Sequence, residues 1–202
     1  MCIRDSYNAS SAKIYTDLGL FTARDDICSD VQDLFNVMTG FGVIDNYRRI
    51  FVSPNHLRAN ITRLIREEAE IHRAKGGGRI IMKCNQLVDQ GIVRELYEAS
   101  RAGVKIECVV RGICSLRPGI KNLSETMSVH SIVGELLEHA RIYYFEHGGE
   151  PVMYVGSADM MTRNLNGRIE VLTPVLDKKL MDNILKPVSY THLRAHETLS
   201  DL

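Results

Sequence analysis

The chain has 202 residues, of which 45% are hydrophobic and 25% are charged, and its formal net charge is zero. This composition is typical of a soluble domain with a sizeable core, and the neutral balance argues against bulk nucleic-acid binding, which needs a basic excess. No apolar run is long enough to span a bilayer. Four of the five cysteines are interpreted as reduced cytosolic thiols, because they lack close metal-site spacing: Cys28, Cys84, Cys108 and Cys114.

Both ends of the chain look foreign to the rest. Residues 1–6, MCIRDS, resemble the translation of a common transposon-end sequencing adapter, and residues 188–198, VSYTHLRAHET, resemble that of its reverse complement. Such complementarity at the DNA level is hard to explain as protein design. We therefore assign residues 1–6 and 188–202 as adapter-derived and non-native, expect neither to continue an apolar face, and exclude both from fold reasoning.

The first predicted elements lie before residue 76. They are strands at 13–22 and 50–53 and helices at 25–38 and 54–75. Apolar residues at helical spacing carry both helix predictions. Ser53 followed by Pro54 is typical of a helix start, and the glycines after Lys75 are typical of a helix end. We expect residues 7–75 to form the C-terminal part of a first domain.

A second domain is expected over residues 76–187. Its predicted elements are strands at 79–85, 104–112 and 168–176, a helix at 89–102, a hairpin that turns at 148–149, and a closing helix from 177. Strand, helix and strand at this spacing predict a βαβ unit with parallel pairing. The whole pattern predicts an α/β layer structure.

Arg111 is the first candidate for an anion site. It ends a predicted strand, and ligands collect beyond the carboxyl ends of parallel strands in open α/β sheets. A guanidinium suits phosphate because its donors form a fixed fork that matches two oxygens. Arg117 and Lys121 follow nearby. A solvated loop is the alternative reading of all three residues.

His139 and Arg141 are the second candidate group. Residues two apart in a strand point to the same face, so a base and a cation would share one small space. The returning strand would bring Ser157, Asp159 and Asn164 to the same rim. A hairpin with one exposed structural histidine is the alternative.

Six segments together carry a resemblance to a known family. They are NASSAKIYTDLGLFT, KCNQLVDQGIVRELYEASRAGV, VVRGICSLRPG, LEHARIYYFEHGG, SADMMTRN and RIEVLTP. In this order and spacing they resemble the C-terminal half of the bacterial polyphosphate kinase family, over nearly all of residues 7–186. The resemblance implies an α/β fold with a phospholipase-D-like mixed sheet flanked by helices, comprising the end of one such domain and most of a second.

The resemblance also implies a function for the full-length protein that contains this chain, here called the parent. It would reversibly transfer the terminal phosphate of ATP to inorganic polyphosphate, releasing ADP, through a phosphohistidine and with Mg²⁺. We expect the parent to be a cytoplasmic homo-oligomer without nucleic-acid binding or a transmembrane segment, with peripheral membrane association as an alternative location.

Matching positions then imply roles for four residues. Tyr15, Arg111 and His139 match ATP-contacting residues of the family, and Arg168 matches a phosphate-facing arginine. His139 would also be catalytic, as the second histidine of a pair, because imidazole hydrogen-bonds phosphate and exchanges a proton near neutral pH. No metal ligand is expected within this chain.

Departures from the family pattern limit what the chain itself is expected to do. The phosphate-accepting histidine and the arginines associated with magnesium are expected upstream of Tyr7, so we expect the fragment to be inactive. Arg141 stands where phospholipase-D motifs have lysine. Two alternatives remain, a catalytically silent phosphate- or nucleotide-binding module and a phospholipase-D-like hydrolase.

Overall fold

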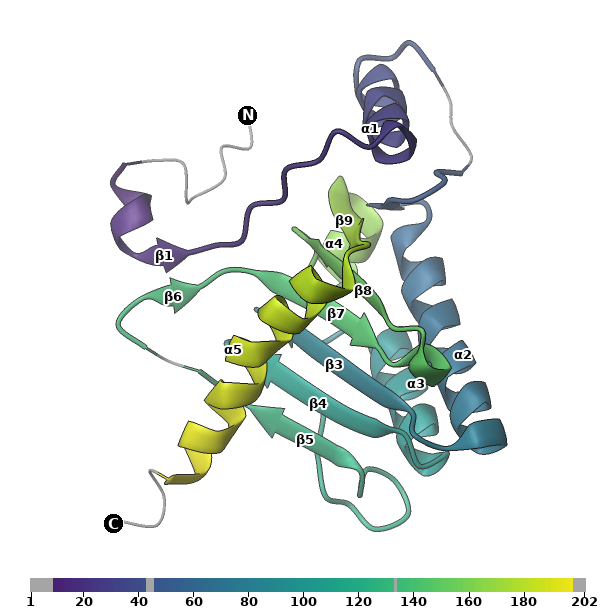
Figure 1. The fold of residues 1–202 in the computed structure, drawn as a ribbon, viewed down its shortest axis with the longest axis vertical. Coiled ribbons are helices and arrows are strands. Elements are labelled where there is room, and N and C mark those ends of the chain that lie inside the picture. Colours follow the sequence, from purple (N-terminus) through teal and green to yellow (C-terminus); the bar gives the residue numbers. More distant parts are fainter. Residues whose placement is uncertain (1–8, 43–45, 133, 198–202) are drawn as a thin grey trace.

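The computed structural model describes residues 9–42, 46–132 and 134–197, and its centre is one mixed sheet (Figure 1). In the described residues the strand order is β2-β9-β8-β7-β3-β4-β5. The strands are β2 (Phe51–Ser53), β3 (Arg79–Cys84), β4 (Lys105–Val110), β5 (Met127–His130), β7 (Arg141–Phe145), β8 (Val152–Gly156) and β9 (Glu170–Val175). A separate small sheet pairs β1 (Tyr15–Thr16) with β6 (Leu137–Glu138) in parallel.

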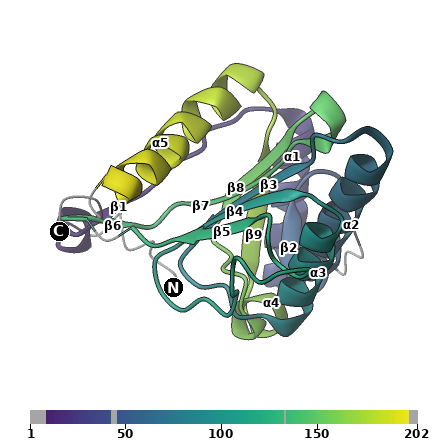
Figure 2. The same ribbon diagram turned by 90° about the horizontal axis from the view of Figure 1, so that it is seen from below.

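Helices lie on both faces of the large sheet. They are α1 (Asp25–Met38), α2 (Leu57–Lys75), α3 (Gln90–Arg101), α4 (Thr162–Gly167) and α5 (Lys178–Glu197), with short 3₁₀ turns at Ser11–Lys13 and His147–Gly149. Helices α2 and α3 cover one face and α5 crosses the other, which is clearest from below (Figure 2). The predicted α/β fold with a mixed sheet flanked by helices is confirmed. No helix in the described ranges is long and apolar enough to cross a membrane.

The predicted βαβ unit is present as β3, α3 and β4. The two strands pair in parallel, from Arg79 opposite Lys105 to Cys84 opposite Val110. Both are buried along almost their whole length, which explains their continuous apolar runs. Asp89 caps α3 by accepting a hydrogen bond of 3.1 Å from the Ile92 amide.

The predicted hairpin is also present. Strands β7 and β8 pair antiparallel, with Phe145 opposite Val152. Because β7 also runs antiparallel to β3, the start of β7 lies beside the carboxyl end of β3. The end of β8 and the start of β9 lie at that same edge, since Gly156 pairs with Leu172. One edge of the sheet therefore gathers chain segments far apart in sequence.

Three apolar clusters are buried in the described part of the chain, and the two largest stabilise the layers. The larger lies between the sheet and helices α2 and α3, and its fully buried side chains include Leu57, Ile61, Ile65, Ile80 and Phe145. The positions from α2 recur at helical spacing, as its amphipathic pattern predicts. Helix α2 and β2 thus share a core with β3 to β5, although they precede residue 76. The domain boundary at 75/76 stays a prediction.

The smaller cluster lies under α5 and corrects one expectation. It contains Ile81, Ile142, Val155 and Val188, and Val188 is only 4% exposed. We expected no apolar contribution from residues 188–202, and that is wrong at Val188. The reason is that α5 continues past Pro187, so its next apolar side chain reaches the sheet.

Two element boundaries also differ from the sequence prediction. Strand 13–22 is reduced to Tyr15–Thr16, because β6 offers only two residues for pairing. The helix expected from Pro54 begins at Leu57. Ser53 does not cap it, because its hydroxyl donates to the Arg168 carbonyl at 2.7 Å and accepts from the Glu170 amide at 3.1 Å. The Ser53 side chain therefore joins the sheet edge instead.

Candidate active site

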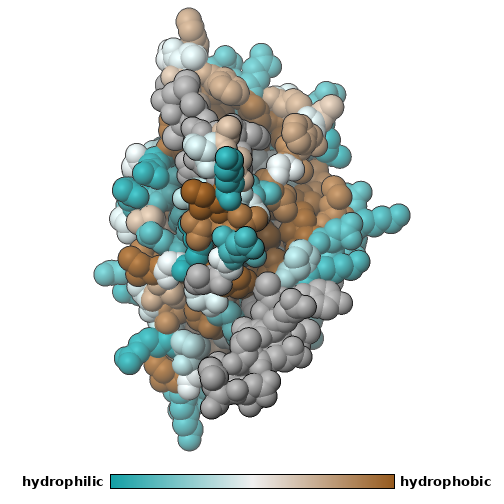
Figure 3. Space-filling model, turned by 90° about the vertical axis from the view of Figure 1, so that its left-hand side faces the viewer, coloured by the Kyte–Doolittle hydropathy of each residue, from teal (hydrophilic) through white to brown (hydrophobic). Residues whose placement is uncertain are grey.

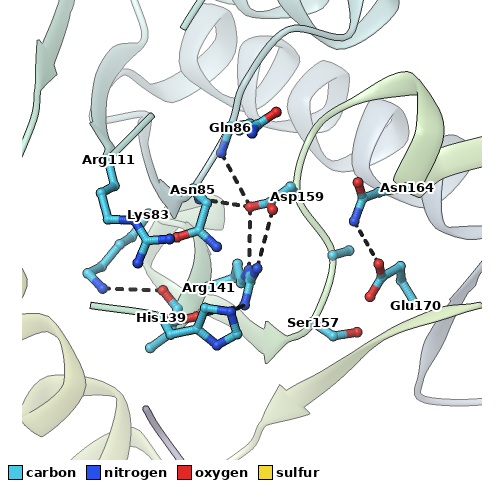
Figure 4. A network of polar contacts seen from close by, with 12 residues as sticks. Lys83, Asn85, Gln86, Arg111, His139, Arg141, Ser157, Asp159, Asn164 and Glu170 are labelled. Atoms are coloured by element: carbon cyan, nitrogen blue, oxygen red, sulfur yellow. Dashed lines mark hydrogen bonds and ion pairs between the residues drawn. The ribbon is translucent and has the colours of Figure 1, made fainter. Parts of the chain in front are cut away.

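The sheet edge described above carries a group of polar side chains (Figure 4). Arg111 directly follows β4, while Asn85 and Gln86 follow β3. His139 lies between β6 and β7, and Asp159 lies in the loop after β8. The topology explains the grouping, because the carboxyl ends of parallel β3 and β4 meet the start of β7 and the end of β8.

His139 lies between a carboxylate and a guanidinium. Its Nδ1 is 3.4 Å from Asp17 Oδ2, and its Nε2 is 3.1 Å from the NH1 group of Arg141. Because a guanidinium only donates, Nε2 accepts there, which puts the proton of the neutral ring on Nδ1, facing Asp17. The ring also makes an edge contact with Tyr15, at 5.3 Å between centroids.

Arg141 is held by a buried ion pair. Its NH2 group is 3.3 Å from Asp159 Oδ2, and the two residues are 8% and 7% exposed. Asp159 Oδ1 also accepts from the amides of Asn85, at 2.7 Å, and Gln86, at 3.3 Å. Arg141 in turn donates to the His139 carbonyl at 2.8 Å. Asp159 thereby fixes Arg141, and Arg141 fixes the His139 ring and backbone.

Arg111 approaches the same place from β4. Its NH1 group donates to the Glu138 carbonyl at 2.9 Å, and its guanidinium carbon lies 5.9 Å from the centroid of the Tyr15 ring. The structure therefore brings together Tyr15, Arg111 and His139. Arg117 and Lys121, by contrast, are exposed in the loop after β4, as expected of a solvated loop.

Arg168 lies two residues before β9, whose start is beside the end of β8. It is exposed at the turn between α4 and β9. Among the described residues, no hydrogen bond joins its side chain to His139 or Arg111. Of the other rim residues, Ser157 accepts from the Val171 amide at 3.2 Å and Asn164 donates to Glu170 at 2.6 Å, so both side chains bind the start of β9.

Sequence reasoning missed two charged residues beside the candidate group. Asp17 faces His139, and Lys83 is 2.9 Å from the carboxylate of Glu138. A signal existed for Asp17, since it lies two residues after Tyr15 in the same segment. Lys83 gave none, because a lysine inside an otherwise apolar strand carries no sequence motif.

Thiol chemistry has little support at this edge. Burial raises the pKa of the Cys84 thiol well above its usual value, and nearby Asp159 and Cys108 raise it further, so Cys84 stays protonated and is a poor nucleophile. Within the described part of the chain, no three His, Cys, Asp or Glu side chains are grouped so that they could hold a metal ion.

Comparison with known proteins identifies the family. The family model for polyphosphate kinase C-terminal domain 2 matches residues 50–196, and that for C-terminal domain 1 matches residues 4–44. The chain belongs to the polyphosphate kinase family. A crystal structure of polyphosphate kinase from Porphyromonas gingivalis superposes with a TM-score of 0.85 at 39% identity, covering 89% of this chain and 28% of that one.

Curated polyphosphate kinases are similar over the same region. Polyphosphate kinase 1 of Chlorobaculum tepidum is 49% identical over 89% of this chain and 26% of its own length. Polyphosphate kinase of a Synechocystis species is 50% identical over 84% of this chain and 23% of its own length. The chain thus spans about a quarter of the length of these relatives.

Proposed function

We propose that the parent protein reversibly transfers the terminal phosphate of ATP to inorganic polyphosphate. The single observation that carries this proposal is the contact of Tyr15, Arg111 and His139 at one sheet edge, in a chain of the polyphosphate kinase family. An aromatic ring, a guanidinium and an imidazole are side chains suited to a nucleotide and its phosphates. ATP and polyphosphate are therefore the proposed substrates.

The proposed reaction has two steps. A histidine upstream of residue 7 attacks the γ-phosphorus, the bond to the β-phosphate oxygen breaks, and ADP leaves. The terminal oxygen of polyphosphate then attacks the same phosphorus, and the phosphorus–nitrogen bond breaks. Catalysis of phosphoryl transfer is mainly positioning and charge stabilisation, because the moving group spreads negative charge over its equatorial oxygens.

The residues of this chain would supply those two contributions. Arg111 would bind phosphate oxygens with its fork of donors, and Tyr15 would hold the nucleotide. Because Arg141 and His139 Nε2 face one another, a phosphate oxygen arriving there would receive an N–H from Arg141. It would receive a second from His139 when the ring carries a proton on Nε2. Asp17 would stabilise that protonated ring.

Other parts of the proposal concern groups outside this network. Arg168 would face phosphate once the upstream segment is present. Mg²⁺ would accompany the phosphates, with any protein ligands outside this chain. The parent would work as a cytoplasmic homo-oligomer.

For the chain alone, a silent nucleotide-binding module is the second candidate. It is favoured by the contacts of His139, because both ring nitrogens have partners, Asp17 and Arg141, and the Nε2 lone pair that could attack phosphorus accepts a hydrogen bond from Arg141. A hydrolase of the phospholipase-D type is not favoured, because the position of its lysine is occupied by Arg141, which is ion-paired with buried Asp159.

Polyphosphate synthesis by the parent tests the proposal. Arg111→Ala and His139→Ala should each lower ATP-to-polyphosphate turnover by roughly 100-fold, the scale seen when one preorganised donor is lost. Arg101→Ala is the control, since the Arg101 side chain on α3 is 55% exposed and pairs with nearby Glu98 at 3.4 Å. Parental turnover in folded Arg111→Ala and His139→Ala proteins would refute the site.

A further inference from the structure

Lys83 is a buried cation beside the candidate active site. It lies on β3, and its residue is only 8% exposed. A buried charge is costly unless it is paired and hydrogen-bonded. The Lys83 ammonium is 2.9 Å from Glu138 Oε2 and donates to the Ala140 carbonyl at 3.2 Å. Its two partners, Glu138 and Ala140, are the residues immediately before and after His139.

Arg111 holds the same segment from the neighbouring strand. It donates to the Glu138 carbonyl at 2.9 Å, while Lys83 binds the Glu138 carboxylate. Two cations, one on β3 and one directly after β4, thus hold residues 138–140 against the large sheet. His139 is the side chain that this segment presents.

Glu138 also connects the two sheets. It belongs to β6, which pairs with β1 through Thr16 opposite Glu138, and the His139 amide donates to the Thr16 carbonyl at 2.9 Å. Tyr15 and Asp17 flank Thr16 in the chain. The Lys83–Glu138 ion pair therefore ties the small sheet, with Tyr15 and Asp17, to the large sheet that carries Arg111 and Arg141.

The surroundings of Lys83 favour a structural partner over a bound phosphate. Its side chain is 10% exposed and lines a groove of about 340 Å³ between the small sheet and α5. The groove walls include Leu18, Ile142 and Ile184, and apolar side chains are visible on this side of the molecule (Figure 3). Asp17 and Glu138 line the groove as well. Their carboxylates would repel a phosphate chain at that place.

We propose that Lys83 is a positioning residue for phosphoryl transfer. Its ion pair with Glu138 fixes the small sheet on the large one, and so sets where His139 and Tyr15 lie relative to Arg111. This inference rests on the proposed function. It predicts that Lys83 acts through Glu138 and that its loss impairs the chemical step more than substrate binding.

Kinetics of the parent with Lys83→Met, Glu138→Gln and both changes together test the inference. Lys83→Met should lower kcat about 100-fold, the scale of a misplacement near 1 Å, with little change in KM for ATP or polyphosphate. The double variant should be no slower than Lys83→Met, because the two side chains act as one unit. Lys105→Met is the matched control, since Lys105 on β4 also pairs with a glutamate, at 3.2 Å, but is 63% exposed.

Hydrogen exchange of the same proteins gives a readout that needs no activity. The amides of Leu137 and His139, which donate to the carbonyls of Ile14 and Thr16, should exchange faster in Lys83→Met and in Glu138→Gln, and at the parental rate in Lys105→Met. If Lys83→Met fails to fold, Glu138→Gln removes the same ion pair from its other side. The Glu138 side chain is 36% exposed, so its replacement leaves no buried gap.

The outcomes separate the two proposals. Faster exchange in a parent that makes no polyphosphate would refute the proposed function and leave the sheet-to-sheet connection supported. Unchanged exchange in an active parent would overturn the positioning role. A raised KM for polyphosphate with parental kcat, and additive effects in the double variant, would overturn it too, because they indicate direct phosphate binding by Lys83.

Discussion

Replacing Asp159 by asparagine tests the polar network behind His139. Asparagine keeps one carbonyl oxygen for the amides of Asn85 and Gln86 but sets its own NH₂ group against the donors of Arg141. The variant loses the bond of 3.3 Å between Arg141 NH2 and Oδ2, together with the charge that pairs with buried Arg141. A hydrogen bond to a charged group contributes about 1.5–3 kcal/mol. We therefore expect Asp159→Asn to destabilise the chain by about 2 kcal/mol.

Thermal unfolding of the purified 202-residue chain measures this effect. At this size, 2 kcal/mol corresponds to a fall in Tm of roughly 4–8 °C. Asp182→Asn is the control, since this substitution makes the same chemical change at an exposed position on α5. A Tm of Asp159→Asn equal to that of the control would refute the reasoning, because it would mean that Asp159 does not hold Arg141.

Two further predictions concern α3 and α5. Burial raises the pKa of Asp89, but the hydrogen bonds that its carboxylate accepts from Arg58 and from the Ile92 amide outweigh that effect and leave the pKa below its usual value. A carboxylate whose pKa is lowered by folding stabilises the fold fully at a pH above its unfolded pKa of about 3.9, and this stabilisation is lost as the pH falls through the folded pKa. The Tm deficit of Asp89→Asn at pH 7 should therefore shrink towards pH 3. An equal deficit at both values would contradict this. Removing residues 188–202 should lower the Tm further than removing 189–202, because burying the Val188 side chain contributes about 2 kcal/mol; equal melting of the two truncations would show that Val188 contributes nothing.

The elements that the sequence predicted well are those whose signal is local. Helix α1 spans Asp25–Met38 as its apolar spacing predicts, and β3 and β4 were indicated by continuous apolar runs. Ser53 was misread because its local context is that of a helix cap. The competing partners, the Arg168 carbonyl and the Glu170 amide, lie more than 100 residues away along the chain. Long-range pairing of this kind leaves no local pattern.

The candidate site shows the same division. The topological rule for strand ends placed Arg111 at the correct edge, and spacing placed Arg141 beside His139. The partners that orient these groups were not predictable in this way, because Asp17 and Lys83 reach His139 and Glu138 only through the pairing of β1 with β6 and of β3 with β7. The roles of Tyr15, Arg111, His139 and Arg168 in ATP or phosphate binding remain predictions.

The central claim is that His139 contacts the phosphate as a partner and does not accept it. Locating the phosphohistidine tests this claim most directly. The parent and the 202-residue chain would be incubated in parallel with γ-labelled ATP and Mg²⁺, digested, and searched for acid-labile, base-stable label. The account predicts label on a parent peptide upstream of residue 7, slower labelling in His139→Ala, and none on the chain. Label on the peptide that contains His139, in either protein and lost in His139→Ala, would contradict it.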